Sequence, residues 1–494
     1  MIESVIFFFS GSGMVMLFIL FMRINVVGSK SKLVKHRSKE PGFVDLLIYA
    51  SVVDEGVIVG KDGSLMAAWA YQGVDSNSST EAERDQVSLQ INHALSRMGS
   101  GWMIHIDAVR KPAPGYSAKD DSHFPDPVSA AIDEERREFF ERVGTLYESN
   151  YVITATYLPP LLAQQKFVEL MFDDEGVPVD SKTRTIALLN HFKRECANIE
   201  SHLSSVFRMK RLKGKIITKE DNSSVNYDAF LRWIQFCISG LDHPVILPKN
   251  PIYLDALLSG QEFWGGVVPK IGQNFIQVVS IEGFPLASSP GLINSLADLP
   301  CLYRWSTRFI FMDTHEAVGH LEKFSKKWKQ KIRSFFDQVF NSHSSNVDQN
   351  AINMVSDAQA AIAETNSGEV AQGYYTSVVV LMSESRGDLE ASARQVAKAI
   401  NHLGFAARIE SINTIDAYLG SLPGHGVENV RRPLLNTMNL ADLMPSNTVW
   451  PGKNEAPCPM YPPMAPPLMH CTTQGATPFR LNLHVRDLGH TFMF

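Results

Sequence analysis

The sequence predicts an α+β protein, with an N-terminal membrane helix followed by mixed α/β subdomains that include ferredoxin-like β-α-β layers. Three observations support this fold class. Positions 5–22 form an uncharged run, and short alternating apolar runs typical of strands recur along the body of the chain. From about residue 263 these runs alternate with amphipathic helical segments. At 494 residues the chain is too long for one core, so several domains are expected.

The first predicted element is a membrane helix over positions 5–22. Its 18 residues carry no charge, and at about 1.5 Å each they span roughly 27 Å, just enough for a bilayer. Glu3 precedes the run and six basic residues follow it up to Lys39. The positive-inside rule therefore places the N-terminus outside, with the basic end of segment 1–40 against anionic lipid. A buried or interfacial helix of a soluble protein is the alternative.

A first α/β subdomain is predicted over 41–160. Asp62-Gly63 lies between two apolar runs, which indicates a hairpin. The elements expected after it are a helix from Ser79 or Thr80 to Gly99, a strand over 102–109, a helix over 127–147 and a strand over 151–157. We expect the 127–147 helix to bury a stripe made of Ile132, Phe139, Val143 and Leu146.

A mainly helical region is predicted over 161–262, and a ferredoxin-like α+β domain over 263–422. The first contains a long helix over 181–212 and a shorter one over 227–241. In the second, strand–helix–strand–helix occurs twice, as in two halves of a ferredoxin-like layer. Its expected strands are 275–281, 303–312, 374–382 and 406–411, and its expected helices are 290–299, 314–340, 351–364, 388–403 and 415–419. The helix over 388–403 is expected to bury Leu389, Ala393, Val396 and Ile400.

The remaining residues are predicted to be a linker, 423–477, and the first strands of a further domain, 478–494. Seven prolines between Pro451 and Pro467 favour an extended, partly polyproline II chain. Residues 478–485 alternate like a strand, and a turn at 486–489, with Gly489 free to take a positive φ, leads into a second strand over 490–494. We therefore expect the chain to be the front portion of a larger protein.

Charge and cysteine content narrow the function classes. The net charge is −6, and because residues 1–39 carry +5, the remainder carries −11. This body is too acidic for a general nucleic-acid binder. The five cysteines include no C-x-x-C pair, which favours reduced thiols. Cys458, His470 and Cys471 could be considered as metal ligands, but a fourth ligand at a useful spacing is missing.

The search for catalytic motifs predicts no catalytic, cofactor-binding or metal-binding residue. None of the Gly-Lys pairs, at positions 60, 214 and 452, belongs to a G-x-x-x-x-G-K-[ST] phosphate loop. His315 and His320 resemble a zinc motif, but a spacing of five turns them about 140° apart on a helix. A helix N-terminus is the better interpretation of that segment.

Two basic segments leave alternatives open. On the helix that contains the basic run Lys323–Arg333, four apolar residues would face the core and the lysines would face out; the four are Phe324, Trp328, Ile332 and Phe335. That face could be simply solvated, or it could contact an acidic partner, a membrane or a nucleic acid. Arg431 and Arg432 could reach a phosphate on a neighbouring domain, or hold their own loop through hydrogen bonds to carbonyls.

Several long segments resemble the CagE/TrbE/VirB family of type IV secretion components, in particular the N-terminal portion of its TrbE-type conjugative-transfer ATPases. The resemblance covers essentially the whole chain. The segments that carry it are 45–50, 62–69, 101–108, 164–172, 420–426 and 479–485. In such proteins a strand like 490–494 leads into the Walker A loop of a RecA-like motor. ATP and Mg²⁺ would therefore belong to the full-length family, and no ATP-binding residue can be assigned to this chain.

The resemblance implies a membrane-docking and assembly role, without ATP hydrolysis by this chain alone. Two alternatives stay open: half of a split ATPase that is completed by a separate P-loop chain, or a stand-alone scaffold of the secretion channel. The implied location is the bacterial inner membrane, with the bulk of the chain on the cytoplasmic side. The implied partners are inner-membrane and channel components, further copies of the chain, a separate ATPase chain and inner-membrane lipid. No direct contact with nucleic acid is expected.

Overall fold

The structure is a computed structural model that describes residues 42–492, except 74, 76–78, 160–178, 219–223, 249–251, 286–287, 340–348, 430 and 474. The chain divides into two compact units, Met1–Leu47 and Ile48–Phe494. In the first, the described part contains the single-turn helix α2 (Phe43–Leu46). All further elements belong to the second unit. The predicted domain boundaries inside that unit stay predictions.

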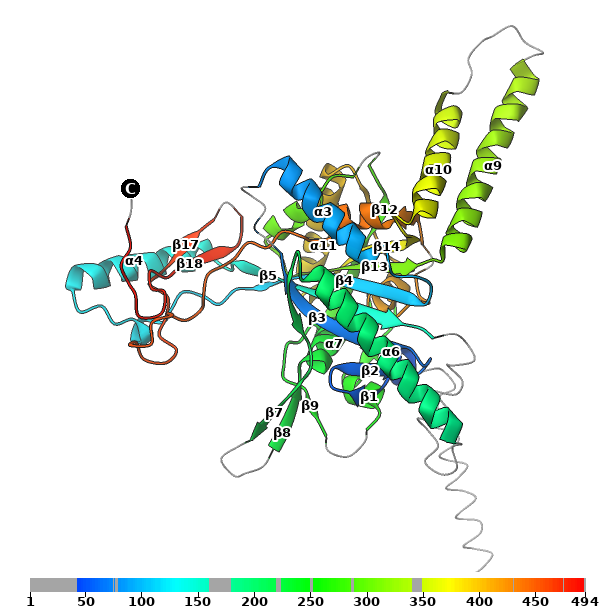
Figure 1. Cartoon of the computed structure of the whole chain (residues 1–494). Helices are drawn as coiled ribbons and strands as arrows, with labels where there is room; N and C mark the ends of the chain where they lie inside the picture. Colours follow the sequence, from blue (N-terminus) through cyan, green and yellow to red (C-terminus); the bar gives the residue numbers. More distant parts are fainter. Residues whose placement is uncertain are drawn as a thin grey trace, which may run out of the picture. The chain divides into compact units, whose positions relative to one another are not determined.

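An antiparallel sheet of 13 strands forms the centre of the Ile48–Phe494 unit in the part that the structure describes (Figure 1). Its main path is β1 (Tyr49–Asp54), β2 (Val57–Gly60), β3 (Leu65–Gln72), β5 (Tyr147–Tyr157), β4 (Trp102–Pro112), β13 (Tyr303–Phe311), β14 (Gln372–Ser383), β12 (Asn274–Gly283), β11 (Lys270–Ile271) and β10 (Phe263–Trp264). Three further strands pair at its sides: β6 (Arg208–Arg211) with β3, β15 (Ala406–Ile409) with β12, and β16 (Leu434–Asn436) with β14.

The pairing of β4 with β13 joins the two strand-rich regions of the sequence into this one sheet. The register runs from Tyr303 opposite Arg110 to Ile310 opposite Met103. On the far side of β13, the order β13-β14-β12-β15 is antiparallel at every step. The sheet therefore continues without interruption from the region 41–160 into the region 263–422.

The predicted fold class is corrected on two points. The α/β regions do not form separate layers, because β4 and β13 make one large antiparallel sheet. In addition, no helix among the described residues is both long and apolar enough to cross a bilayer, which contradicts the predicted N-terminal membrane helix. The run at 5–22, on which that prediction was based, lies outside the described residues.

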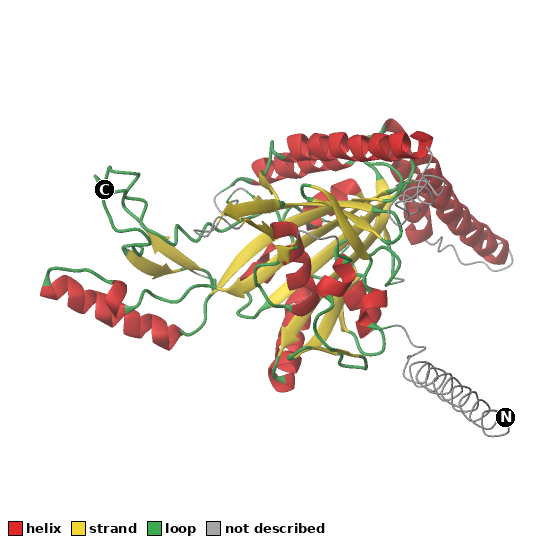
Figure 2. Ribbon diagram, turned by 90° about the horizontal axis from the view of Figure 1, so that it is seen from below, coloured by secondary structure: helices red, strands yellow, loops and turns green. Residues whose placement is uncertain are grey.

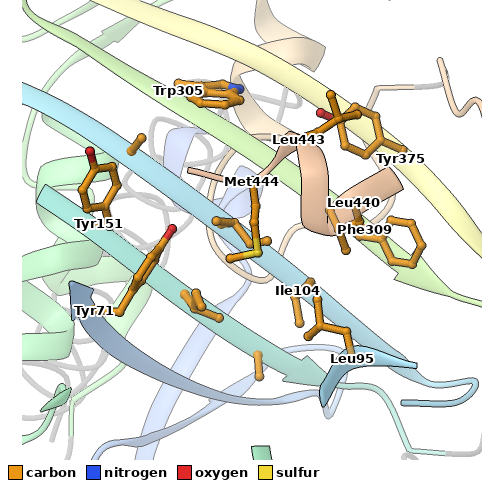
Figure 3. Close-up of a cluster of buried hydrophobic side chains, with 14 of the residues drawn as sticks. Tyr71, Leu95, Ile104, Tyr151, Trp305, Phe309, Tyr375, Leu440, Leu443 and Met444 are labelled. Atoms are coloured by element: carbon orange, nitrogen blue, oxygen red, sulfur yellow. The ribbon is translucent and has the colours of Figure 1, made fainter. Parts of the chain in front are cut away.

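The main core lies on one face of the sheet, beneath four helices. These are α3 (Glu81–Leu95), α6 (Val179–Leu203), α11 (Arg386–His402) and α13 (Thr437–Leu443). Figure 3 shows part of this core, in which Leu440, Leu443 and Met444 lie over the strand residues Ile104, Trp305 and Phe309. In Figure 2 helices cover both faces of the strands. The other face is next to α7 (Ala229–Ser239), α8 (Leu254–Leu258) and α12 (Thr414–Leu419).

Smaller elements extend from the sheet. α9 (Thr314–Val339) and α10 (Gln349–Ser367) follow β13 and precede β14 in the sequence, and they pack against each other (Figure 1). β7 (Gly214–Thr218), β8 (Ser224–Asp228) and β9 (Ile246–Leu247) form a three-stranded sheet, and β17 (Met469–Thr472) pairs with β18 (Pro478–Leu481) beside α4 (Pro127–Val143). Two single turns of 3₁₀ helix are η1 (Lys119–Asp121) and η2 (Asn294–Asp298).

Most predicted elements are confirmed, and the local reasons are visible. Thr80 caps α3: its hydroxyl accepts the backbone N–H of Glu83, whose carboxylate accepts the N–H of Thr80. The hairpin at Asp62-Gly63 joins β2 to β3, and Gly63 has a φ of 79°. All four residues predicted to face the core on α11 are buried, namely Leu389, Ala393, Val396 and Ile400. The helix expected over 290–299 is only the short η2.

The predicted buried face of α4 is wrong. Ile132 is 54% exposed and Phe139 is 44% exposed, whereas Phe140 is buried. Phe140 packs on Tyr116 and on the imidazole of His470 in β17. A neighbour more than 300 residues away in the sequence thus decides which face is inside, and the apolar stripe points outward.

The C-terminal region also differs from the prediction. β18 pairs with β17, which precedes it, and residues 490–492 form no strand. In the turn it is Arg486, with a φ of 58°, that adopts the left-handed conformation rather than Gly489. The proline-rich segment is not fully extended, because Ala456 N–H donates to Ala465 O at 2.8 Å and Cys458 is buried.

Candidate functional site

A layer of buried charged side chains lies on the face of the sheet opposite the main core. Residues in a strand alternate between faces, and Ile104, Ile106 and Ala108 of β4 belong to the core. His105 and Asp107, between them, therefore point to the other face. On β13 the same face carries three polar side chains. In the register Ser306 lies opposite Asp107 and Arg308 lies opposite His105, while Arg304 is two residues before Ser306.

Arg304 links the sheet to the loop above it. Its guanidinium is 2.9 Å from Oδ1 of Asp107, and both groups are almost completely buried. The same guanidinium donates to the carbonyl of Ser421 at 2.8 Å and to its hydroxyl at 2.6 Å. Ser306 donates to that carbonyl as well, at 3.1 Å. Ser421 is thus held by three hydrogen bonds from two residues of β13.

Arg308 holds the next part of the same segment, residues 420–429, which we call the 420–429 loop. Its guanidinium donates to the carbonyls of Gly420 at 3.4 Å, His425 at 3.1 Å and Asn429 at 3.2 Å. Tyr49, from β1, donates its hydroxyl to the carbonyl of Pro423 at 2.8 Å. The loop is therefore tied down along its whole length by side chains from the sheet.

Burial shifts the pKa values of this layer. Burial, followed by the nearby guanidinium of Arg308, lowers the pKa of His105 well below its usual value, so the imidazole is neutral at pH 7. Burial raises the pKa of Asp107, and Arg304 acts in the opposite direction. Burial, followed by repulsion from Arg432, lowers the pKa of Arg308 to about 10, so this side chain stays charged at neutral pH.

Arg432 holds the loop through hydrogen bonds to carbonyls, as one of the two predicted alternatives has it, whereas Arg431 pairs with carboxylates outside the loop. Arg432 donates to the carbonyls of Gly426 at 3.2 Å and Val427 at 2.6 Å. Arg431 pairs with the carboxylates of Glu410 and Glu282. Both guanidinium groups are therefore occupied by partners within the chain.

The geometry of the layer suits mechanical support. Its guanidinium groups form hydrogen bonds to a carboxylate and to main-chain carbonyls, and its side chains are buried. A buried network of this kind rigidifies what it holds. The layer fixes the 420–429 loop as a rigid part of the molecule.

The three Gly-Lys pairs of the sequence lie in different local structures. Gly60-Lys61 lies in the β2–β3 turn, where Lys61 pairs with Asp255 at 2.7 Å. Gly214-Lys215 begins strand β7, and Gly452-Lys453 lies in a loop. A phosphate loop needs a strand, a glycine-rich turn and a helix N-terminus in succession. None of these Gly-Lys pairs has that setting.

The other sequence candidates lie apart from the polar layer. His315 and His320 lie on α9, with His320 Nε2 4.0 Å from Glu316. In the described part of the chain no group of His, Cys, Asp and Glu is suited to a metal ion. Phe324, predicted to face the core, is 45% exposed, and Lys326 pairs with Glu322 at 3.5 Å. The side chains of Trp328, Ile332 and Phe335 lie outside the described residues.

Sequence reasoning missed the polar layer itself. The available signal was the alternation of charged and apolar residues inside two runs that read as strands. His105 and Asp107 alternate with Ile104 and Ile106 in one run, and Arg304 and Arg308 occur in the other. Charged residues at alternate positions of a strand usually face solvent, and only the paired register and the loop above show that these are buried.

Two family models match the chain. The model of the N-terminal domain of the type IV secretion system ATPase VirB4/TrbE matches residues 56–165, and that of the CagE, TrbE, VirB family, component of type IV transporter system, matches residues 215–431. The first match contains Asp107, and the second contains Arg304 and the whole of the 420–429 loop. The polar layer therefore lies where the two matched regions pair through β4 and β13.

Three curated relatives share close sequence similarity with the chain. It is 46% identical over 461 residues to conjugal transfer protein TrbE of Rhizobium radiobacter, covering 93% of this chain and 56% of that relative. The other two come from Sinorhizobium fredii, where a probable conjugal transfer protein TrbE is named as two separate pieces. The second piece is 46% identical over 304 residues, which is 61% of this chain and 46% of the relative. The first piece is 49% identical over 125 residues, which is 25% of this chain and 84% of the relative.

The chain thus spans about half the length of two of these relatives, 56% of the Rhizobium radiobacter protein and 46% of the second Sinorhizobium fredii piece. It spans most of the first Sinorhizobium fredii piece. These relatives and both family models agree on one family. This chain belongs to the CagE, TrbE, VirB family, whose members are components of type IV transporter systems.

Proposed function

We propose that this chain is the docking and assembly portion of a conjugal-transfer protein in a type IV secretion system, and that it does not hydrolyse ATP by itself. The observation that carries this proposal is the apolar surface of the C-terminal lobe. We give this name to residues 451–492 together with residues 113–146, which pack against them. Large apolar side chains on this lobe are exposed: Val128 by 66%, Ile132 by 54%, Met460 by 76%, Met464 by 75% and Val485 by 74%.

Exposed apolar patches mark interaction sites, and Val128, Ile132 and Phe139 are all exposed at helical spacing on α4. The lobe nevertheless has a defined structure. Arg136 donates to the carbonyl of His470, and the rings of Tyr116 and His470 lie 4.9 Å apart. The inner face of α4 is therefore packed against β17, and its outer face is left for a partner.

We propose that the occupant of this surface is a P-loop motor segment, of the kind that the family resemblance implies for full-length members. The two Sinorhizobium fredii relatives are named as two parts of one TrbE protein and both match this chain, so they illustrate that a TrbE protein can be divided into two chains, but at a different place from the one proposed here. The function would then be completed in trans: this chain supplies the docking surface, and the partner supplies nucleotide chemistry.

Purified chain tests the first half of the proposal. We expect no detectable ATP turnover and no ATP binding at micromolar concentrations. The portion of the Rhizobium radiobacter relative that this chain does not match, prepared separately, should bind the chain in a pull-down and in calorimetry. Micromolar ATP binding by the isolated chain would contradict the proposal.

Matched variants test the docking surface. Ile132→Glu with Phe139→Glu places two charges on the outer face of α4 and should weaken binding of the motor segment at least about tenfold. Ile216→Glu with Ile246→Glu is the control, because these residues of β7 and β9 are also exposed, by 69% and 48%. Equal weakening by both pairs would show that the lobe is not the docking surface.

We also propose that the chain works on the cytoplasmic side of the bacterial inner membrane, attached through channel components of the secretion system. Fractionation of cells with and without the other conjugal-transfer genes tests this. The chain should sediment with membranes only when those components are present. The third interpretation, a stand-alone scaffold, is favoured instead if it joins the channel while no motor segment binds.

A further inference from the structure

A site distinct from the polar layer lies between β6 and α7. It is a cleft of about 530 Å³, lined also by residues of β3, β4 and β5. Four cationic side chains line it: Lys111, Arg208, Lys210 and Arg232. They come from three different elements, so the fold gathers positive charge that is dispersed in the sequence.

The cleft is not neutralised by its own carboxylates. Asp242 bridges two of the cations, at 2.7 Å from Lys111 and 2.6 Å from Arg232. Burial opposes ionisation of Asp242, but hydrogen bonds from these partners lower its pKa. Glu148, the other carboxylate in the lining, pairs with Arg480. The cleft therefore keeps an excess of positive charge in a chain whose net charge is −6.

Arg208 and Lys210 account for this excess. Both are exposed, and neither has an ion-pair partner within the ranges that the structure describes. They are two residues apart on β6, so they point to the same side about 7 Å apart. An extended chain with acidic side chains at every second position has the same spacing.

The aromatic residues that line the cleft indicate which class of anion it could bind. Trp233, Phe236 and Tyr151 contribute apolar surface, but they are only 7%, 6% and 5% exposed. Single-stranded nucleic acid is usually held by bases stacked on exposed aromatic rings, and these rings are not accessible in that way. The accessible part of the cleft is instead its cationic rim, which is complementary to the carboxylates of an acidic peptide.

We propose that this cleft binds an extended acidic peptide segment of a partner protein, with carboxylates at alternate positions meeting Arg208 and Lys210. Complementary charge fixes the position of the segment and speeds its association. The simpler alternative is that charges on β6 only prevent unwanted strand pairing, which requires no ligand.

The experiment uses the whole chain and a fluorescein-labelled peptide of alternating glutamate and valine. Fluorescence anisotropy should show saturable binding that weakens with salt, because the contacts are charge pairs near solvent. A peptide with glutamine in place of glutamate should bind at least about tenfold more weakly. Arg208→Glu with Lys210→Glu should lower the affinity by at least about tenfold as well.

Arg394→Glu with Lys398→Glu on α11 is the matched control. It makes the same change of charge at exposed positions that do not line the cleft, and should change the affinity by less than about twofold. If the charge-reversed protein fails to fold by circular dichroism, Arg208→Gln with Lys210→Gln replaces it, with a loss of at least about fivefold expected.

Three results would overturn the proposal. One is absence of peptide binding at millimolar concentration. Another is equal loss in the cleft variant and the α11 control, which would indicate only general attraction to charge. The third is tighter binding of a single-stranded oligonucleotide that is lost in the Arg208 and Lys210 variant, which would assign the cleft to nucleic acid.

Discussion

The polar layer and the basic cleft both contain arginine paired with aspartate, but the pair is buried in the layer and partly exposed in the cleft. In the layer, the guanidinium of Arg304 is 4% exposed and meets a carboxylate and the main chain of the 420–429 loop. In the cleft, Arg232 is 49% exposed and shares its carboxylate with Lys111. Removing water makes charge contacts strong and their loss costly, whereas solvent screens the others. The comparison suggests that the layer stabilises the fold and that the cleft is available to a ligand.

The largest effect is expected when the carboxylate of each site is removed. Asp107→Ala leaves Arg304 buried without its partner and should lower the free energy of unfolding by about 3–5 kcal/mol. Asp242→Ala in the cleft should lower it by less than about 1 kcal/mol. Urea denaturation followed by circular dichroism measures both. Equal losses would mean that burial does not separate the two sites.

A glycine of the 420–429 loop should give the next largest effect. Gly424 has a φ of 87°, and a β-carbon there would meet Met66 and the side chain of Ile48. Gly424→Ala should cost about 2–3 kcal/mol, from strain and crowding together. Gly368→Ala is the control, since its φ is 76° with no atom near the new carbon, and it should cost about 1 kcal/mol. The difference in denaturation midpoint isolates the packing of the loop, and identical midpoints would show that the loop is loosely held.

Acid should destabilise the chain through its buried histidines. Burial and Arg308 lower the pKa of His105, and burial with Arg480 and Arg136 lowers that of His470 to about 4. Below about pH 6.5 the unfolded chain therefore binds protons that the folded chain refuses. Stability falls with decreasing pH, by up to about 1.4 kcal/mol per pH unit for each group.

The variants His105→Gln and His470→Gln should each flatten this dependence between pH 6.5 and 5. Asp107 acts with the opposite sign, because its pKa is raised, so the informative quantity is the difference in slope from the wild-type chain. His243→Gln, at an exposed position, is the control and should leave the slope unchanged. A slope that is the same in all variants would contradict the role of burial.

The sequence predicts an element correctly where the pattern depends only on residues that are close together in the chain. The spacing of Leu389, Ala393, Val396 and Ile400 predicts the buried face of α11, because residues three and four apart share a helix face. The predicted strands of the sheet are likewise found, since alternation survives in any register. What periodicity cannot give is which strand pairs with which. The pairing of β4 with β13, about 200 residues apart, is what creates the polar layer.

The failures have the same origin. The stripe of Ile132 and Phe139 on α4 has a helical period, which predicts burial, but the contacts of Phe140 with His470 turn it outward. The sequence predicts a strand over 478–485, a turn and a second strand over 490–494, yet β18 pairs with β17, which comes before it. In each case a tertiary contact overrides the local pattern, from a distant residue for α4 and from the preceding strand for β18. The stripe on α4 is part of the proposed docking surface.

The smallest expected effect completes the comparison. Arg208→Gln with Lys210→Gln should change the free energy of unfolding by less than about 0.5 kcal/mol, because both side chains are exposed and make no ion pair in the described part of the chain. The same variant should weaken binding of the acidic peptide. A residue that serves recognition is expected to separate these two readouts, whereas a structural residue such as Asp107 moves stability first. If the double variant unfolds at a clearly lower urea concentration, the two cations stabilise the fold. The proposed distinction, in which the layer stabilises the fold and the cleft binds a ligand, would then be wrong.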